Sequence, residues 1–278
     1  MKKFLWLLAI AIATLAFAAC GDDEEEPAAS GGAEQTADPA AELGLKTEGQ
    51  LTIGAEFPVP GFLELPIDDP KGYEADLGKA LAAELGVEKV KWVSTPFSGL
   101  FSPAPKPFDM AINEVTITDE RSQVVDFSDP YFSANQGYLV TKGGPGEAAD
   151  SIAAMKDLQF GFQATTTGGP YIKDKIQPSK EPRQYSTLGA ATKALANGQI
   201  DAFLMDVAIG SSIVADLGDE IAMPGQFETG EEYGIVFQKG NALREKVNEA
   251  IATLKSSGKL KEMQAEWFPG TESLKVFE

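Results

Sequence analysis

Two patterns of apolar and polar positions occur along the first half of the chain, short apolar runs and apolar residues at helical spacing. Short apolar runs at 51–54, 90–93, 110–112 and 137–141 have the length of buried strands. Between the first two runs, apolar residues recur at helical spacing over 73–86, where a glycine ends the predicted helix. The apolar face of this helix is formed by Leu77, Ala80, Leu81 and Leu85.

The same alternation restarts in the second half. Apolar runs at 158–163, 200–205 and 233–238 predict strands, and Ser186 is expected to cap a helix that ends at 197–198. Strands that alternate with helices predict an α/β protein with largely parallel sheets, and the restart predicts two lobes. Further helices are expected to begin at Asn241 and after Gly258.

The N-terminus predicts export. Lys2 and Lys3 precede an apolar run over 4–19, which is shorter than a membrane-spanning helix, so 1–19 is expected to be a signal peptide. The ending at 17–20 resembles a bacterial lipoprotein cleavage box, which implies that Cys20 is acylated and anchors the protein to the cell membrane. The alternative is an ordinary signal peptide followed by a free thiol.

Residues 20–46 are predicted to form a flexible tether. They are rich in Ala, Gly, Pro, Asp and Glu and have few bulky apolar side chains, so they cannot form a core. The whole chain has a net charge of −19, which argues against binding to nucleic acid or to anionic lipid.

The chain contains no histidine. This excludes Ser-His-Asp and Cys-His catalysis and removes the commonest metal ligand. We therefore predict no catalytic residue, no cofactor and no metal site.

The most informative stretch is 108–132, FDMAINEVTITDERSQVVDFSDPYF. Its apolar run ends in Asn113 and Glu114, and Thr116 and Arg121 follow. Ligands collect beyond the carboxyl ends of strands in α/β proteins, and an arginine fork with nearby hydroxyl groups suits a small carboxylic acid. Taken alone, the stretch also fits a strand, a turn and an exposed arginine.

Five segments together resemble one family, the solute-binding proteins of polar amino-acid ABC importers, which have the type II periplasmic-binding fold. The segments follow the order of the family motifs along nearly the whole mature chain. They are GYEADLGKALAAELG (72–86), FDMAINEVTITDER with FSDPYF (108–132), FGFQATTTG (160–168), NGQIDAFLMD (197–206) and KLKEMQAEWF (259–268).

The resemblance implies a two-lobed protein, each lobe a mostly parallel sheet flanked by helices, with two hinge strands joining them. Lobe 1 would comprise 47–138 and 236–278, and lobe 2 would comprise 139–235. The ligand would bind between the lobes, which close around it by a hinge motion.

The resemblance also implies roles for single residues. Arg121 would bind the α-carboxylate of an amino acid, Asp206 would pair with its ammonium group, and Thr166 and Thr167 would complete carboxylate binding. Helix N-capping is the alternative for Asp206 and for the two threonines. The other implied lining residues are Asn113, Glu114 and Thr116 on the α-amino side, Phe97 packing on the ligand, Glu56 as an acid found in some binders of basic amino acids, and Phe57 and Phe62 as further aromatic walls.

Three positions depart from the family pattern. Glu114 replaces a small residue, so that it either points away from the pocket or adds negative charge to it. Thr165 replaces a common glycine in the lobe 2 turn, and the Pro-rich segment 102–107 replaces the usual helix near Phe97.

The resemblance implies an extracytoplasmic, monomeric binding component that delivers an L-amino acid to ABC permease subunits in the membrane. A cationic amino acid such as arginine or lysine is expected if Glu56 and Glu114 face its side chain, and otherwise glutamine or another polar amino acid. The alternatives are a dehydratase or lyase on the same fold, with Glu114 as its proton-transfer residue, and a ligand-sensing subunit of a membrane receptor.

Overall fold

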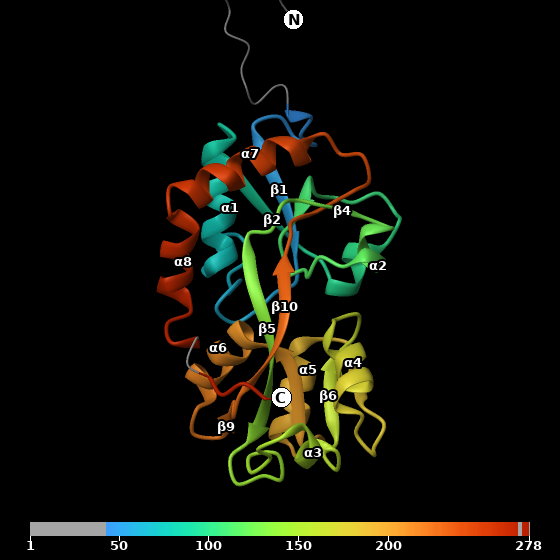
Figure 1. Ribbon diagram of the computed structural model, residues 1–278. Coiled ribbons are helices and arrows are strands. Elements are labelled where there is room, and N and C mark those ends of the chain that lie inside the picture. Colours follow the sequence, from blue (N-terminus) through green and yellow to red (C-terminus); the bar gives the residue numbers. More distant parts are fainter. Residues whose placement is uncertain (1–42, 272–273, 278) are drawn as a thin grey trace, which may run out of the picture. The chain divides into compact units, whose positions relative to one another are not determined.

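The computed structural model describes residues 43–271 and 274–277. The chain divides into two compact units, 1–36 and 37–278, and every described residue belongs to the second unit. The predicted signal peptide, Cys20 and most of the predicted tether lie outside the described residues. The described part contains two β-sheets with helices around each of them (Figure 1).

The first sheet has the strand order β2-β1-β3-β11-β4. Strand β1 pairs in parallel with β2 and β3, whereas β11 pairs antiparallel with β3 and β4. Its strands are β1 (Gln50–Ala55), β2 (Lys89–Ser94), β3 (Met110–Ala111), β4 (Asp126–Phe127) and β11 (Val236–Phe237).

Long helices lie beside this sheet, and two short ones follow β2 and β3. Helix α1 contacts both C-terminal helices, α7 and α8, as Figure 1 shows. The helices are α1 (Tyr73–Glu84), the 3-10 turn η2 (Phe97–Phe101), α2 (Asp119–Ser122), α7 (Leu243–Ser256) and α8 (Lys259–Trp267).

The second sheet has the order β10-β5-β8-β6-β7. Strand β6 pairs in parallel with β7 and β8, and β5 pairs antiparallel with β8 and β10. The strands are β5 (Phe132–Thr141), β6 (Phe160–Gln163), β7 (Arg183–Tyr185), β8 (Ala202–Asp206) and β10 (Gln226–Tyr233), with β9 (Ile221–Ala222) beside β5.

The helices around the second sheet are short. Helix α6 begins directly after β8, so that Asp206 lies at the junction of strand and helix. The helices are α3 (Ile152–Met155), α4 (Gly168–Tyr171), the π-helical turn η3 (Ile172–Ile176), α5 (Leu188–Ala196) and α6 (Val207–Leu217).

The long antiparallel strands β5 and β10 lie side by side and connect the two sheets (Figure 1). At the end of β10, Tyr233 bridges to Thr116, and the Gly234 N–H donates to the Val115 carbonyl. The predicted two-lobed α/β fold with two connecting strands is therefore confirmed. We call the parts around the first and second sheets lobe 1 and lobe 2.

Several predicted details are wrong. The predicted strand over 233–238 is two strands, because the chain leaves the second sheet after Tyr233 and joins the first at Val236. Helix α5 is capped by Thr187 and not Ser186, since the Thr187 hydroxyl accepts from the Ala190 N–H at 3.2 Å. Both sheets are mixed, because strands β5 and β11 run against their neighbours.

Both ends of the described part differ from the predicted boundaries. Leu43 is buried in the core, so the folded part begins before residue 47. At the other end, the Phe277 N–H donates to the Gln226 carbonyl, and the Phe277 ring packs against Tyr138 and Phe227 of lobe 2. The last residues thus lie beside the second sheet, while the rest of the lobe boundaries stay predictions.

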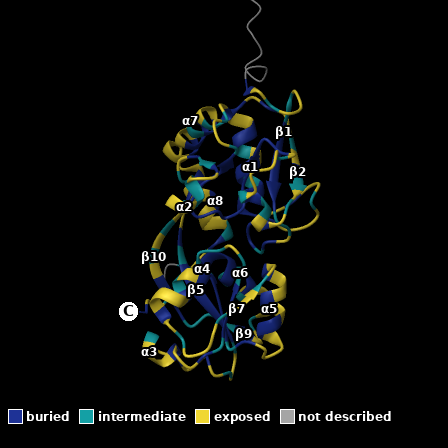
Figure 2. Ribbon diagram, turned by 90° about the vertical axis from the view of Figure 1, so that its right-hand side faces the viewer, coloured by how far each residue is buried: buried dark blue, intermediate teal, exposed yellow. Residues whose placement is uncertain are grey.

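Burial follows the strands. Figure 2 shows buried residues along the strands of both sheets and exposed residues on the outer faces of α5 and α7. Within residues 43–271 and 274–277, none of the helices combines the length and the apolar character that a membrane span requires.

Candidate functional site

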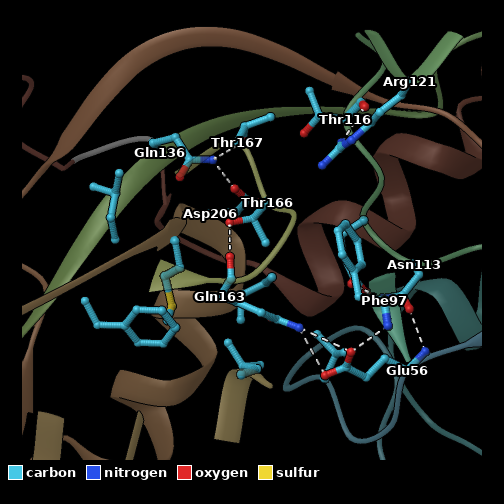
Figure 3. Close-up of a pocket in the computed structure, with 17 residues that line it drawn as sticks. Glu56, Phe97, Asn113, Thr116, Arg121, Gln136, Gln163, Thr166, Thr167 and Asp206 are labelled. Carbon is cyan, nitrogen blue, oxygen red and sulfur yellow. Dashed lines mark hydrogen bonds between the residues drawn. The ribbon is translucent and has the colours of Figure 1, made fainter. Parts of the chain in front are cut away.

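A cavity of about 50 Å³ lies between residues of the two lobes (Figure 3). Nine of the ten predicted site residues line it: Glu56, Phe97, Asn113, Glu114, Thr116 and Arg121 from lobe 1, and Thr166, Thr167 and Asp206 from lobe 2.

The two predicted aromatic walls are not part of this cavity. Phe57 lines a neighbouring cavity of about 650 Å³, which shares Glu56 and Leu188 with the first. Phe62 is fully buried among the rings of Tyr73 and Phe132, so it is a core residue.

Arg121 is held in place from both lobes. It lies in α2, where the Thr118 hydroxyl accepts from its N–H at 3.2 Å. Its guanidinium donates to the Thr116 carbonyl at 2.7 Å in lobe 1 and to the Thr165 carbonyl at 2.8 Å in lobe 2. The group also lies over the Phe101 ring, 4.9 Å from its centre. Burial lowers the pKa of Arg121, but a guanidinium remains charged in proteins.

A carboxylate already lies between the two threonines that were assigned to ligand binding. Glu231 on β10 accepts a hydrogen bond from the Thr116 hydroxyl at 2.7 Å and from the Thr167 hydroxyl at 2.9 Å. The negative charges of Glu231 and Asp206 favour the charged form of Arg121. The hydroxyl pair near Arg121 can therefore bind a carboxylate, because it binds one from the protein itself.

The turn after β6 has an unusual backbone. Thr165, where the family commonly has glycine, adopts a left-handed conformation with φ 64°, and its carbonyl faces Arg121. The Thr166 hydroxyl donates to the Gln163 carbonyl at 2.8 Å. Thr167 precedes α4 but makes no capping bond, so the capping alternative does not account for its side chain.

Asp206 ends β8 inside the cavity. Its carboxylate accepts from the Tyr233 hydroxyl at 2.5 Å and from the Gln136 amide, and it makes no capping bond to α6. Burial, and secondarily the charge of Glu231, raise the pKa of Asp206 to about 7. A cation placed beside Asp206 would restore its charge.

Glu114 is one of the residues that line the cavity. It is 6 % exposed and has φ 46°. Its N–H donates to a Glu74 carboxyl oxygen at 2.8 Å, and its own carboxyl accepts from the Asn113 amide at 2.6 Å. Glu74, on α1, is fully buried and also accepts from the Tyr131 hydroxyl. Burial raises the pKa of Glu74 to about 7, and burial together with the charge of Glu74 raises that of Glu114 well above its usual value.

Glu56 lies at the opposite end of the cavity from Asp206, as Figure 3 shows. Its carboxylate accepts from the Phe97 N–H at 2.9 Å and from the Gln163 side-chain amide at 3.2 Å. Its own N–H donates to Asn113 at 2.5 Å. Glu56 thus links the two lobes through Gln163 of lobe 2.

Five polar residues of the site and its immediate surroundings were not predicted from the sequence. Three of them lie on the connecting strands β5 and β10, where Gln136 is the register partner of Asp206. Glu74 lies in the helix motif at 72–86 that carries part of the family resemblance, and this position could have indicated it. The missed residues are Glu74, Gln136, Gln163, Glu231 and Tyr233.

The fold and this arrangement define a two-lobed solute-binding protein with an arginine and an aspartate at one cavity. The family model of bacterial extracellular solute-binding proteins, family 3, matches residues 51–270, and the chain belongs to this family.

Related proteins agree with this assignment. The chain is 32% identical over 230 residues to the L-cystine-binding protein of Escherichia coli, covering 81% of this chain and 84% of the relative. It is 30% identical over 287 residues to an ABC transporter glutamine-binding protein of Bacillus subtilis, covering 96% of this chain and 97% of the relative. A solved structure of an ancestral arginine-binding protein bound to glutamine matches with TM-score 0.71 and 33% identity, covering 80% of this chain and 99% of that one.

Proposed function

We propose that this protein is the extracytoplasmic receptor of an amino-acid ABC importer, anchored through an acylated Cys20 and acting as a monomer. It captures an L-amino acid between its lobes and delivers it to permease subunits in the membrane. The carrying observation is that Arg121 of lobe 1 and Asp206 of lobe 2 line the same cavity. This pair of opposite charges suits the α-carboxylate and the α-ammonium group of an amino acid.

The charge of the cavity favours a cationic side chain. Glu56, Glu114 and Asp206 line it together with a single arginine, so a neutral amino acid would leave an excess of acidic groups at the cavity. Glu56 lies away from Asp206, where the side chain of a bound amino acid would end. We therefore place arginine or lysine ahead of glutamine, which the amide of Gln163 and the carboxylate of Glu56 could also bind.

The test is calorimetric titration with the twenty amino acids and ornithine, supported by thermal shifts. A ligand at a hundred times its dissociation constant should stabilise the protein by about 2.7 kcal/mol. Arg121→Ala should abolish binding while the folded protein remains, because the carboxylate loses its charged partner. Retained affinity in this variant would remove the central assignment of the proposal.

One observation favours a second candidate, a dehydratase or lyase. Glu114 is a buried acid at the cavity whose pKa is raised well above its usual value, as a proton-transfer residue would require. Steady product formation from prephenate-like acids would establish this candidate, and its absence alongside amino-acid binding would exclude it.

A further inference from the structure

Two buried carboxyl oxygens beside the cavity have no hydrogen-bond partner among the described residues. One is Oε2 of Glu74 and the other is Oε1 of Glu114. Each belongs to a carboxyl group whose other oxygen is already engaged, that of Glu74 by Tyr131 and that of Glu114 by Asn113. An unpartnered buried acceptor is costly, so these two oxygens require an explanation.

The two carboxyl groups interact closely. The Glu114 N–H donates to the Glu74 carboxyl at 2.8 Å, and both residues are buried. Two carboxylates this close cannot both be charged without strong repulsion. A single proton on the pair removes that repulsion and gives each of the two free oxygens a partner.

The groups that face the pair come from every neighbouring element. They are Tyr73 in α1, Tyr131 before β5, Tyr233 at the end of β10 and Asp206 at the end of β8. The carboxylate of Asp206 is the nearest further acid that raises the pKa of Glu114 by its charge. Asp206 and Glu114 line the same cavity, as does Gln136, whose Oε1 is also buried without a partner among the described residues.

An ammonium group has three N–H donors, and Glu114, Asp206 and Gln136 each bring an acceptor group to the cavity. We propose that Glu114, together with Asp206 and Gln136, binds the α-ammonium group of the ligand, and that the Glu74–Glu114 pair releases its shared proton when the ammonium enters. This inference rests on the proposed function and names the residue that makes capture dependent on proton exchange. The O–H bond of the pair breaks, the proton passes to solvent, and an N–H of the ligand takes its place.

The sign of the pH dependence follows from this exchange. At pH values where the pair holds its proton, the ligand must displace it, so affinity rises as the pH rises. One linked proton changes the dissociation constant by at most about tenfold per pH unit. We expect the affinity for L-arginine to increase at least about tenfold between pH 6 and pH 8.

The experiment is calorimetric titration of the full chain with L-arginine, and with L-glutamine as a second probe, in phosphate and in Tris at pH 7. These buffers differ in ionisation enthalpy, so the difference in observed heat gives the number of protons released. Glu114→Gln keeps the size of the side chain but cannot lose a proton. It should release fewer protons and show a flatter affinity profile from pH 6 to pH 8. Glu88→Gln, at an exposed position, is the matched control and should behave as the parent protein.

The outcomes separate the inference from the function on which it rests. Binding of either probe without proton release overturns the inference and leaves the receptor function in place. Full proton release in Glu114→Gln also overturns it, because the proton would then come from Asp206. If neither these probes nor any other of the twenty amino acids or ornithine binds, with circular dichroism showing a folded protein, the amino-acid function and the inference are refuted together. Glu114→Ser, which restores a residue typical of the family, should lower the number of protons released in the same way as Glu114→Gln.

Discussion

Removing the carboxylate of Glu231 should increase the affinity for an amino acid. Glu231 accepts hydrogen bonds from the hydroxyl groups of Thr116 and Thr167, at 2.7 and 2.9 Å. The Thr167 hydroxyl is predicted to bind the ligand's α-carboxylate, and the pair that it forms with Thr116 beside Arg121 can hold a carboxylate. An incoming carboxylate must therefore displace Glu231, and the bonds that it breaks are subtracted from its binding free energy.

The size of the effect follows from these two bonds. A hydrogen bond to a charged group contributes about 1.5–3 kcal/mol, but Glu231 is only half-buried, and water can replace the displaced partners. We therefore expect a net competition of about 1–2 kcal/mol, which corresponds to about fivefold to thirtyfold in the dissociation constant. In the absence of ligand, loss of the same bonds should lower the free energy of unfolding by about 1 kcal/mol.

Glu231→Ala should thus bind L-arginine more tightly in calorimetry and unfold at lower denaturant concentration when no ligand is added. Glu232→Ala is the matched control, because Glu232 is the next residue on β10 and its side chain is exposed. Weaker binding by Glu231→Ala would refute the reasoning, since it would mean that Glu231 supports the ligand. Unchanged affinity would show that the ligand does not use these hydroxyl groups.

Three further predictions follow from the site. Thr165→Gly should raise the free energy of unfolding by up to about 1 kcal/mol in urea titrations, because glycine adopts the left-handed backbone of this position without strain. Thr166→Gly is the control and should not stabilise the protein. An equal loss of unfolding free energy in both variants would contradict the prediction. The pKa of Asp206 is raised to about 7, so the folded protein keeps a proton that the unfolded chain loses near pH 4. The free energy of unfolding should therefore fall as the pH rises from about 4 to about 7. In Asp206→Asn the free energy of unfolding should fall less over this pH range. Parallel pH profiles of unfolding for the variant and the parent protein would refute this prediction. Glu56→Gln should weaken the binding of L-arginine more than the binding of L-glutamine. Glu84→Gln, at an exposed position, is the control. An equal loss of affinity for both ligands would contradict the prediction.

The sequence predicts the residues that follow strands better than those that lie on the connecting strands. Glu56 follows β1, Asn113 and Glu114 follow β3, and Asp206 ends β8, and all of them line the cavity. Their proximity was predictable, because strand ends in α/β sheets meet at a common edge. The predicted positions of lining residues therefore depended on local patterns and on one general rule of topology.

Glu231 and Gln136 could not be found in this way. Their positions depend on the register between β5 and β10, which pairs residues about a hundred positions apart, for example Tyr233 with Phe132. No local pattern fixes that register. Phe57 was assigned wrongly for a related reason, since the path of the loop after β1 decides which of two adjacent cavities its ring lines.

The polar groups of the site already have hydrogen-bond partners within the protein. The binding free energy of a ligand is therefore the difference between the bonds that it forms with these groups and the bonds that it replaces. Arg121 donates to two carbonyl groups, Glu56 accepts from Gln163, and Asp206 accepts from Tyr233. A ligand that bonds to these groups exchanges one partner for another and gains little from each exchange. Glu114 differs, because in our proposal the proton shared with Glu74 is what satisfies its otherwise unpartnered carboxyl oxygen. A ligand N–H that takes the place of this proton releases it to solvent, so the exchange at Glu114 depends on pH as well as on the two partners.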